Sequence, residues 1–203
     1  MAGRLLDDDP EVAYLHAQEA VRRAGRVDVV REAAAITAYR TGRYAEALRE
    51  LRTVRRLNGS DEHLALMADC ERGLGRPDRA LALGAEPGAR ALEPESQIEL
   101  AIVLSGARLD LGDPEAALAL LSAPLVKGAQ GEVALRVTEA RAAALHAAGR
   151  TTEAEELLRT IGLGSGPGDG PGEDVVVFDL EDDDDQGTEQ DGGLGAADTA
   201  GER

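Results

Sequence analysis

Gly42-Arg43-Tyr44-Ala45-Glu46-Ala47-Leu48 is the stretch of sequence that decides the fold. Its pattern of a glycine followed five residues later by an alanine recurs at Gly75 and Ala80, Gly112 and Ala117, and Gly149 and Ala154. Successive glycines are 33, 37 and 37 residues apart, and two helices with two short turns need about 34 residues. The spacing therefore predicts a chain of helical hairpins, each of which buries its apolar face against its neighbours.

Apolar residues between these glycines recur at helical spacing, in segments that Gly, Pro and Asp separate. The expected helices cover residues 10–24, 28–41, 44–57, 61–74, 77–85, 95–111, 114–123, 132–148 and 151–161. Asp9-Pro10-Glu11 and Asp113-Pro114-Glu115 repeat one helix-start signal, in which Asp caps the free amides and Pro takes the first helical position. The sequence predicts an all-α fold with no β-sheet in the first 160 residues.

The composition agrees with this fold class. One Phe, three Tyr and no Trp leave a core of Leu, Val, Ile, Met and Ala, which favours helices over sheets. The single cysteine, Cys70, cannot form an internal disulfide, and the N-terminal residues lack the apolar run of a signal peptide. No stretch approaches 18 uninterrupted apolar residues. We expect a reduced, cytoplasmic protein with no membrane contact.

The acidic charge is concentrated at the C-terminal end. Residues 164–203 hold 13 of the 39 acidic residues and one of the 22 basic residues, so they carry −12 and the rest of the chain carries −5. Low apolar content predicts a disordered tail. Within it, the β-prone run Val175–Leu180 precedes acidic residues 181–185. The run could add as a strand to the sheet edge of a partner or lie in a groove of the chain itself, while residues 182–185 meet the chain's arginines.

The repeated turn resembles that of the tetratricopeptide repeat family. Gly42-Arg43-Tyr44-Ala45-Glu46-Ala47-Leu48 is similar to the family's turn and second-helix start, and Gly112-Asp113-Pro114 and Gly149-Arg150-Thr151 are looser versions. The family's first-helix aromatic is missing, and Arg31, Leu64, Ala101 and Thr138 stand at its positions. The likeness covers roughly residues 28–161. It implies a right-handed superhelical α-solenoid of antiparallel hairpins that binds a protein or peptide and is not an enzyme.

The chain then divides into a leading helical segment (1–27), a repeat array (28–163) and the acidic tail (164–203). Leu5-Leu6-Asp7-Asp8-Asp9-Pro10 resembles the end of a second repeat helix. The leading segment is therefore either the remainder of a truncated repeat or a frayed start before the helix at residue 10.

The sequence offers no candidate catalytic, metal or cofactor residues. His16, His63 and His146 lie on separate expected helices, no second cysteine accompanies Cys70, and no phosphate-binding glycine loop is present. We interpret Cys70 as a buried, inert thiol and helix carboxylates such as Glu46 and Glu50 as a solvated face. A small regulator or hydrolase with dispersed catalytic residues stays an open alternative.

The resemblance implies that partners bind along the face formed by the first helix of each hairpin. The glycine register places these candidate partner-binding residues there: Glu32, Ile36, Tyr39, Arg40, Leu66, Asp69, Arg72, Ile102, Val103, Leu109, Glu139, Ala143 and His146. The Lys and Asn residues with which some family members bind chaperone tails are absent from these positions. We therefore expect a groove of mixed apolar and charged character.

A second candidate surface is a basic face on residues 44–57, where Arg49, Arg52 and Arg56 follow three- and four-residue steps. Three interpretations stay open: solvated arginines, a protein-docking face, or an interface for nucleic acid. The lack of an aromatic platform and the acidic tail argue against nucleic acid. The arginines are also the expected site for self-docking of the tail.

Overall fold

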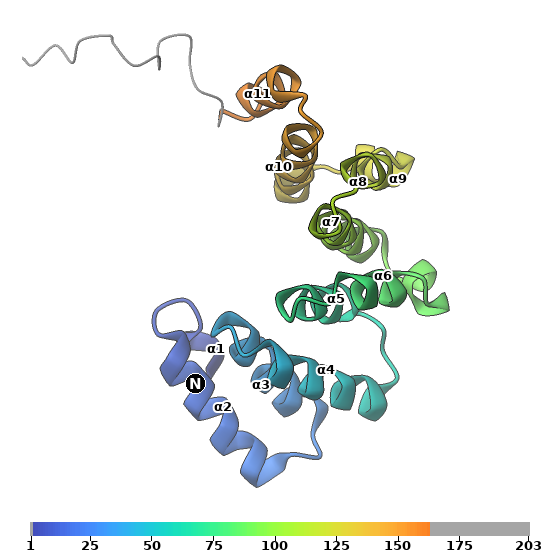
Figure 1. The fold of residues 1–203 in the computed structure, drawn as a ribbon. Helices are drawn as coiled ribbons and strands as arrows, with labels where there is room; N and C mark the ends of the chain where they lie inside the picture. Colours follow the sequence, from blue (N-terminus) through green and yellow to red (C-terminus); the bar gives the residue numbers. More distant parts are fainter. Residues whose placement is uncertain (1, 163–203) are drawn as a thin grey trace, which may run out of the picture. The chain divides into compact units, whose positions relative to one another are not determined.

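The computed structural model describes residues 2–162, and these form helices without any β-strand (Figure 1). The elements are α1 (Ala2–Leu5), α2 (Pro10–Ala24), α3 (Asp28–Arg40), α4 (Tyr44–Asn58), α5 (Leu64–Gly73), α6 (Pro77–Gly84), the 3₁₀-helix η1 (Pro87–Ala91), α7 (Pro94–Asp110), α8 (Pro114–Leu121), α9 (Pro124–Lys127), α10 (Gly131–Ala147) and α11 (Thr151–Arg159). Each helix expected from the sequence is present within three residues of its predicted ends. The unpredicted elements α1, η1 and α9 are too short to show a helical period.

Four hairpins share one turn. In α3/α4, α5/α6, α7/α8 and α10/α11 the glycine between the helices has a φ of 72°, 69°, 74° and 77°, respectively. This left-handed conformation favours glycine. In the first hairpin the Arg43 amide bonds the Ala38 carbonyl at 2.8 Å, and the same bond links Arg76 to Glu71, Asp113 to Arg108 and Arg150 to Leu145. The repeated glycine therefore fixes the reversal of the chain at each hairpin.

The alanine five residues after each glycine is buried where the two helices of a hairpin meet. Ala47, Ala80 and Ala117 are fully buried, and Ala154 is 3% exposed. A methyl side chain lets two helix backbones approach closely, which a larger residue would prevent. Around these contacts Leu51, Leu64 and Leu121 are the largest fully buried apolar side chains. The glycine and alanine pattern thus describes the packing of each hairpin as well as its turn.

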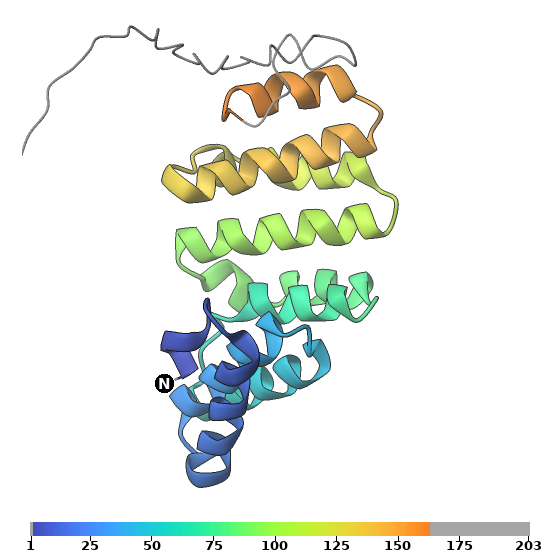
Figure 2. The same cartoon turned by 90° about the vertical axis from the view of Figure 1, so that its left-hand side faces the viewer.

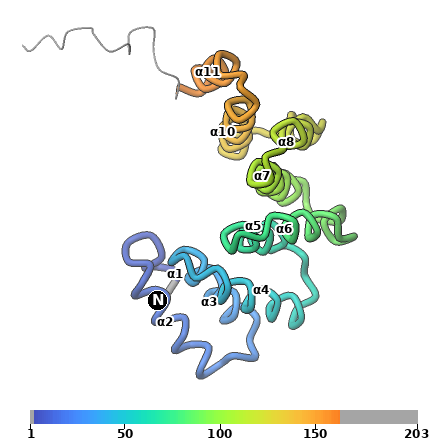
Figure 3. The backbone as a smooth tube through the Cα atoms, viewed as in Figure 1, coloured from blue at the N-terminus to red at the C-terminus, as the bar shows by residue number. Residues whose placement is uncertain are grey.

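Neighbouring hairpins stack within residues 2–162. Helix α5 contacts α4 and α7, and α7 contacts α10, while α6 packs on α7 and α8 packs on α10. Figure 2 shows α5, α7, α10 and α11 stacked one beyond the next, with their axes roughly aligned. The tube in Figure 3 traces how the first helices α3, α5, α7 and α10 follow one another. This arrangement is the predicted array of antiparallel helical hairpins.

The N-terminal helices pack on the first hairpin. Helix α2 contacts α3, and α1 contacts both. The start signals behave as predicted, since Asp9 accepts a hydrogen bond from the Val12 amide at 3.0 Å and Asp113 accepts one from the Ala116 amide at 3.1 Å.

The boundaries at 27/28 and 163/164 stay predictions, and the predicted disordered tail with its run 175–180 lies outside the described residues.

Two helix carboxylates are buried, which corrects the expectation that Glu50 lies on a solvated face. Glu50 is 4% exposed, and Arg31 of α3 pairs with it at 2.6 Å. Glu71 of α5 is 1% exposed and accepts a hydrogen bond from Arg52 of α4 at 2.9 Å. Each buried charge therefore has a partner on an adjacent helix, as burial of a carboxylate requires.

Replacement of Gly73 by alanine tests the contact between the first two hairpins. A Cβ atom at residue 73 would lie 2.5 Å from the Tyr44 ring, and that ring also packs edge-on against Tyr39, with centroids 5.8 Å apart. We expect Gly73→Ala to lower the free energy of unfolding by about 1–3 kcal/mol, because overpacking outweighs the helix propensity gained. Urea denaturation followed by circular dichroism measures this loss.

Gly128→Ala is the matched control for that substitution. Gly128 has a φ of −85°, and its nearest neighbour to an added Cβ is at an ordinary 3.4 Å. Its change should stay within about 0.5 kcal/mol. Equal stability of the Gly73→Ala variant and the unmodified protein would contradict the tight contact.

Candidate functional site

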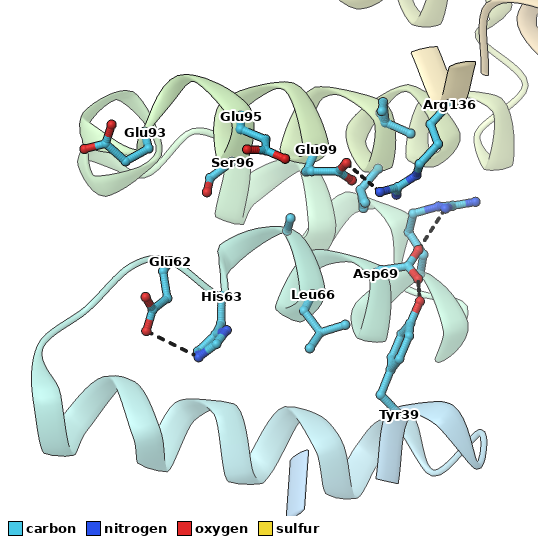
Figure 4. Close-up of a pocket in the computed structure, with 14 residues that line it drawn as sticks. Tyr39, Glu62, His63, Leu66, Asp69, Glu93, Glu95, Ser96, Glu99 and Arg136 are labelled. Carbon is cyan, nitrogen blue, oxygen red and sulfur yellow. Dashed lines mark hydrogen bonds and ion pairs between the residues drawn. The ribbon is translucent and has the colours of Figure 1, made fainter. Parts of the chain in front are cut away.

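A groove of about 660 Å³ lies along the first helices of the hairpins (Figure 4). Its walls come from α3, α5 with the residues before it, α7, and α10. The lining residues are Tyr39, Glu62, His63, Ala65, Leu66, Asp69, Arg72, Glu93, Glu95, Ser96, Glu99, Ile102, Val103 and Arg136. Four segments that are distant in sequence thus contribute to one concave surface.

The middle of the groove is apolar. Ala65 and Leu66 of α5 face Ile102 and Val103 of α7, and all four are only half-buried. They also pack against the core, Leu66 on the cluster around Met67 and Val103 on the cluster around Leu64 and Ala68. The groove floor is therefore an apolar strip, packed on the core, that a ligand could cover further.

One end of the groove is a closed network of polar contacts. The Tyr39 hydroxyl donates to Asp69, and Arg72 pairs with Asp69 at 3.0 Å and with Asp110 at 2.8 Å. Burial, followed by the hydrogen bond to Asp69, raises the pKa of Tyr39, so this hydroxyl stays protonated and donates. Arg136 pairs with Glu99 at 2.5 Å in the same region. Charges at this end are satisfied by one another.

The opposite end carries unbalanced negative charge. Figure 4 places Glu62 and Glu93 there, with Glu95 further along α7. All three are exposed, and no Arg or Lys of residues 2–162 forms an ion pair with any of them. The Nε2 atom of His63 lies 3.5 Å from carboxylate oxygens of Glu32 and Glu62, and it is buried without a hydrogen bond.

The structure brings some of the predicted partner-binding residues together. Tyr39, Leu66, Asp69, Arg72, Ile102 and Val103 all line the groove. Glu32 and Ile36 line a separate hollow of about 250 Å³ beside Leu6 of the N-terminal segment. Arg40 pairs with Asp7 at 2.8 Å, outside the groove.

The remaining predicted positions lie elsewhere. Leu109 packs against the core cluster that includes Leu118 and Leu145. Glu139, Ala143 and His146 are exposed on α10 and do not line the groove, to which α10 contributes Arg136 instead. The last hairpin contributes to this groove only through Arg136 in the first half of α10, and a binding role of Glu139, Ala143 and His146 stays a prediction.

Several lining residues were missed by sequence reasoning. Glu62, His63 and Glu93 precede the first helices, while Glu95, Ser96 and Glu99 occupy the first two turns of α7. The glycine register counts back from the end of a helix, so it does not reach these positions. Glu93 and Glu95, which flank Pro94, were the available signal for these positions. Proline marks a helix start, so it places both acidic residues near the beginning of α7.

The predicted basic face is largely neutralised within the fold. Arg49 lies 3.2 Å from Glu50 and 3.6 Å from Glu46, and Arg52 pairs with Glu71. Arg56 is exposed and has no ion pair within residues 2–162. These contacts lend no support to a nucleic-acid interface, and tail docking on these arginines stays a prediction.

The described part of the chain offers little reactive chemistry. Burial raises the pKa of the Cys70 thiol to about 12, so the thiol is protonated at neutral pH, as an inert cysteine should be. Residues 2–162 contain no group of three His, Cys, Asp or Glu side chains arranged to hold a metal ion.

Of the helices that the structure describes, none combines the length and the apolar character needed to cross a bilayer.

Comparison with known proteins agrees with the helical-repeat architecture. The family model described as tetratricopeptide repeat matches residues 29–53, 98–123 and 135–160. These segments fall on the hairpins α3/α4, α7/α8 and α10/α11. Comparisons with curated proteins and with solved structures found no match. With four hairpins that share one turn and three that match the family model, the chain is a tetratricopeptide repeat protein.

Proposed function

We propose that this protein is a non-enzymatic adaptor that binds an extended segment of a protein partner in the groove. Tetratricopeptide repeats in general serve protein interaction and carry no catalytic activity. The observation that carries the proposal is the convergence of four first-helix segments on one groove with an apolar floor. A half-buried apolar strip between polar ends suits a peptide backbone with alternating side chains.

The groove matches a peptide better than a small molecule. Its lining residues come from several helices, and the apolar ones, Leu66, Ile102 and Val103, form a strip instead of an enclosed cavity. The pKa values of Tyr39 and Arg72 in this lining are raised, and both side chains are engaged with Asp69. Positioning of a chain segment, not catalysis, is the role that this arrangement supports.

Blocking the groove with a bulky side chain tests this function. Ser96 lines the groove from α7 and is half-buried, so Ser96→Trp should fill space that a ligand needs while leaving the core intact. We expect peptides selected from a random display library on the full chain to bind at least about tenfold more weakly to this variant. Fluorescence anisotropy of labelled peptides measures the affinity.

Glu139→Trp is the control for added bulk on an exposed helix surface. Glu139 lies on α10 outside the groove, so its replacement should leave the affinity within about twofold. Circular dichroism verifies that both variants keep their helical content. Selected peptides that bind the Ser96→Trp variant and the unmodified protein equally would rule out the groove as the binding site.

A further inference from the structure

We infer that the groove recognises a cationic segment, in which arginine or lysine side chains alternate with apolar ones. This inference rests on the proposed function and specifies the chemistry of the partner. The apolar side chains would cover Leu66, Ile102 and Val103, and the cationic ones would meet Glu62, Glu93 and Glu95.

The charge count of the lining is the first support. Five carboxylates line the groove, those of Glu62, Asp69, Glu93, Glu95 and Glu99, against the two guanidinium groups of Arg72 and Arg136. Both arginines are held by carboxylates, Arg72 by Asp69 and Asp110 and Arg136 by Glu99. The excess negative charge thus resides on carboxylates that no arginine or lysine of the described residues neutralises.

The distribution of that charge is the second support. The carboxylates without an arginine or lysine partner in residues 2–162 project from two successive repeats, Glu62 just before α5 and Glu93 and Glu95 around the start of α7, so they flank the groove from both sides (Figure 4). A positive side chain between them would gain attraction from both repeats. An acidic ligand would meet like charges, which costs affinity and slows association.

The apolar strip sets the spacing of the ligand. Ala65 and Leu66 contribute to this strip from α5, and Ile102 and Val103 contribute to it from α7. In an extended peptide, successive side chains point to opposite sides. A segment that alternates apolar and basic residues can therefore cover the strip and direct its charges to the carboxylates.

The same charge pattern disfavours the chain's own acidic segment as the occupant. Residues 164–203 carry −12, and an acidic peptide is repelled by Glu62, Glu93 and Glu95. The acidic run 181–185 would need positive partners that this end of the groove does not provide.

Three synthetic decapeptides test the inference on the full chain. They alternate leucine with arginine, with glutamine or with glutamate, and they carry the same label for fluorescence anisotropy at about 0.15 M salt. We expect the arginine peptide to bind at least about tenfold more tightly than the glutamine peptide, and the glutamate peptide to bind most weakly.

Substitutions that remove negative charge show whether the preference for arginine comes from the groove carboxylates or from the general acidity of the chain. The triple variant Glu62→Gln/Glu93→Gln/Glu95→Gln should weaken the arginine peptide about tenfold and leave the glutamine peptide unchanged. The matched control Asp78→Asn/Glu155→Gln/Glu156→Gln removes three exposed carboxylates outside the groove lining. Its affinity for the arginine peptide should stay within about twofold.

The outcomes distinguish this inference from the proposed function. Equal weakening by both triple variants, or equal affinity for the arginine and glutamine peptides, would overturn the cationic preference. If the Ser96→Trp variant still bound the glutamine peptide more weakly than the unmodified protein does, the groove would be a peptide-binding site without a preference for cationic segments. Equal affinity of all three peptides for the Ser96→Trp variant and the unmodified protein would contradict the proposed function itself.

Discussion

Leu51→Ala should lower the free energy of unfolding by about 3 kcal/mol, within the range of 2–5 kcal/mol typical of buried leucines. Leu51 of α4 is fully buried in a cluster with Ala35 and Ala38 of α3 and Met67 and Cys70 of α5. Truncation removes contacts from three helices at once. Because small alanines surround the site and helix backbones already lie close together, the neighbours have little freedom to fill the cavity.

Leu57→Ala on the same helix is the control. Leu57 is 43% exposed, so its truncation should cost less than about 1 kcal/mol. Urea denaturation followed by far-ultraviolet circular dichroism compares the two variants, since the chain has no tryptophan to report unfolding. Equal losses for the two leucines would show that the cluster around Leu51 does not stabilise the stack.

Arg31→Met should also lower the free energy of unfolding by about 3 kcal/mol, because it leaves the Glu50 carboxylate buried without its main partner. The Arg31 guanidinium lies 2.6 Å from Glu50 and also donates to the Gly25 carbonyl at 2.7 Å. Arg49 remains 3.2 Å from Glu50, but its side chain is 67% exposed and can compensate only weakly.

A double-mutant cycle identifies the cause of that loss. Arg31→Met/Glu50→Met replaces both charges with apolar groups, so it should recover at least half of the lost stability. The exposed pair of Arg22 and Glu19, with side chains 74% and 40% exposed, supplies the control. Arg22→Met should cost less than about 0.5 kcal/mol. A double variant no more stable than Arg31→Met would mean that the arginine acts through packing instead of charge.

The fold was predictable because its signals are local. A positive φ at Gly42, Gly75, Gly112 and Gly149 depends on the absence of a side chain at each turn, and the burial of the following alanines depends on short spacing along one helix. Such requirements recur with the repeat and stand out in the sequence. The hairpin α5/α6 was still predicted by its glycine, although α6 is short and the family model does not match it.

The groove was only partly predictable. Tyr39, Leu66, Asp69, Arg72 and Val103 were found because they lie on the inward face of first helices, which the helical period gives directly. Glu62 and His63 were missed because they precede α5, where the glycine register does not reach, and Arg136 was missed because it lies in the first half of α10.

By itself the sequence determined the helical class, the hairpin turns and the buried alanines, because these follow from backbone geometry and from spacing within about a dozen residues. Only the tertiary structure decided which charges are satisfied. Arg31 meets Glu50 across 19 residues and Arg72 meets Asp110 across 38, so these pairs form only after hairpins dock. Within residues 2–162, docking leaves Glu62, Glu93 and Glu95 without an arginine or lysine partner, which is a property of the assembled stack, since electrostatic interaction depends on distance in space and not along the chain.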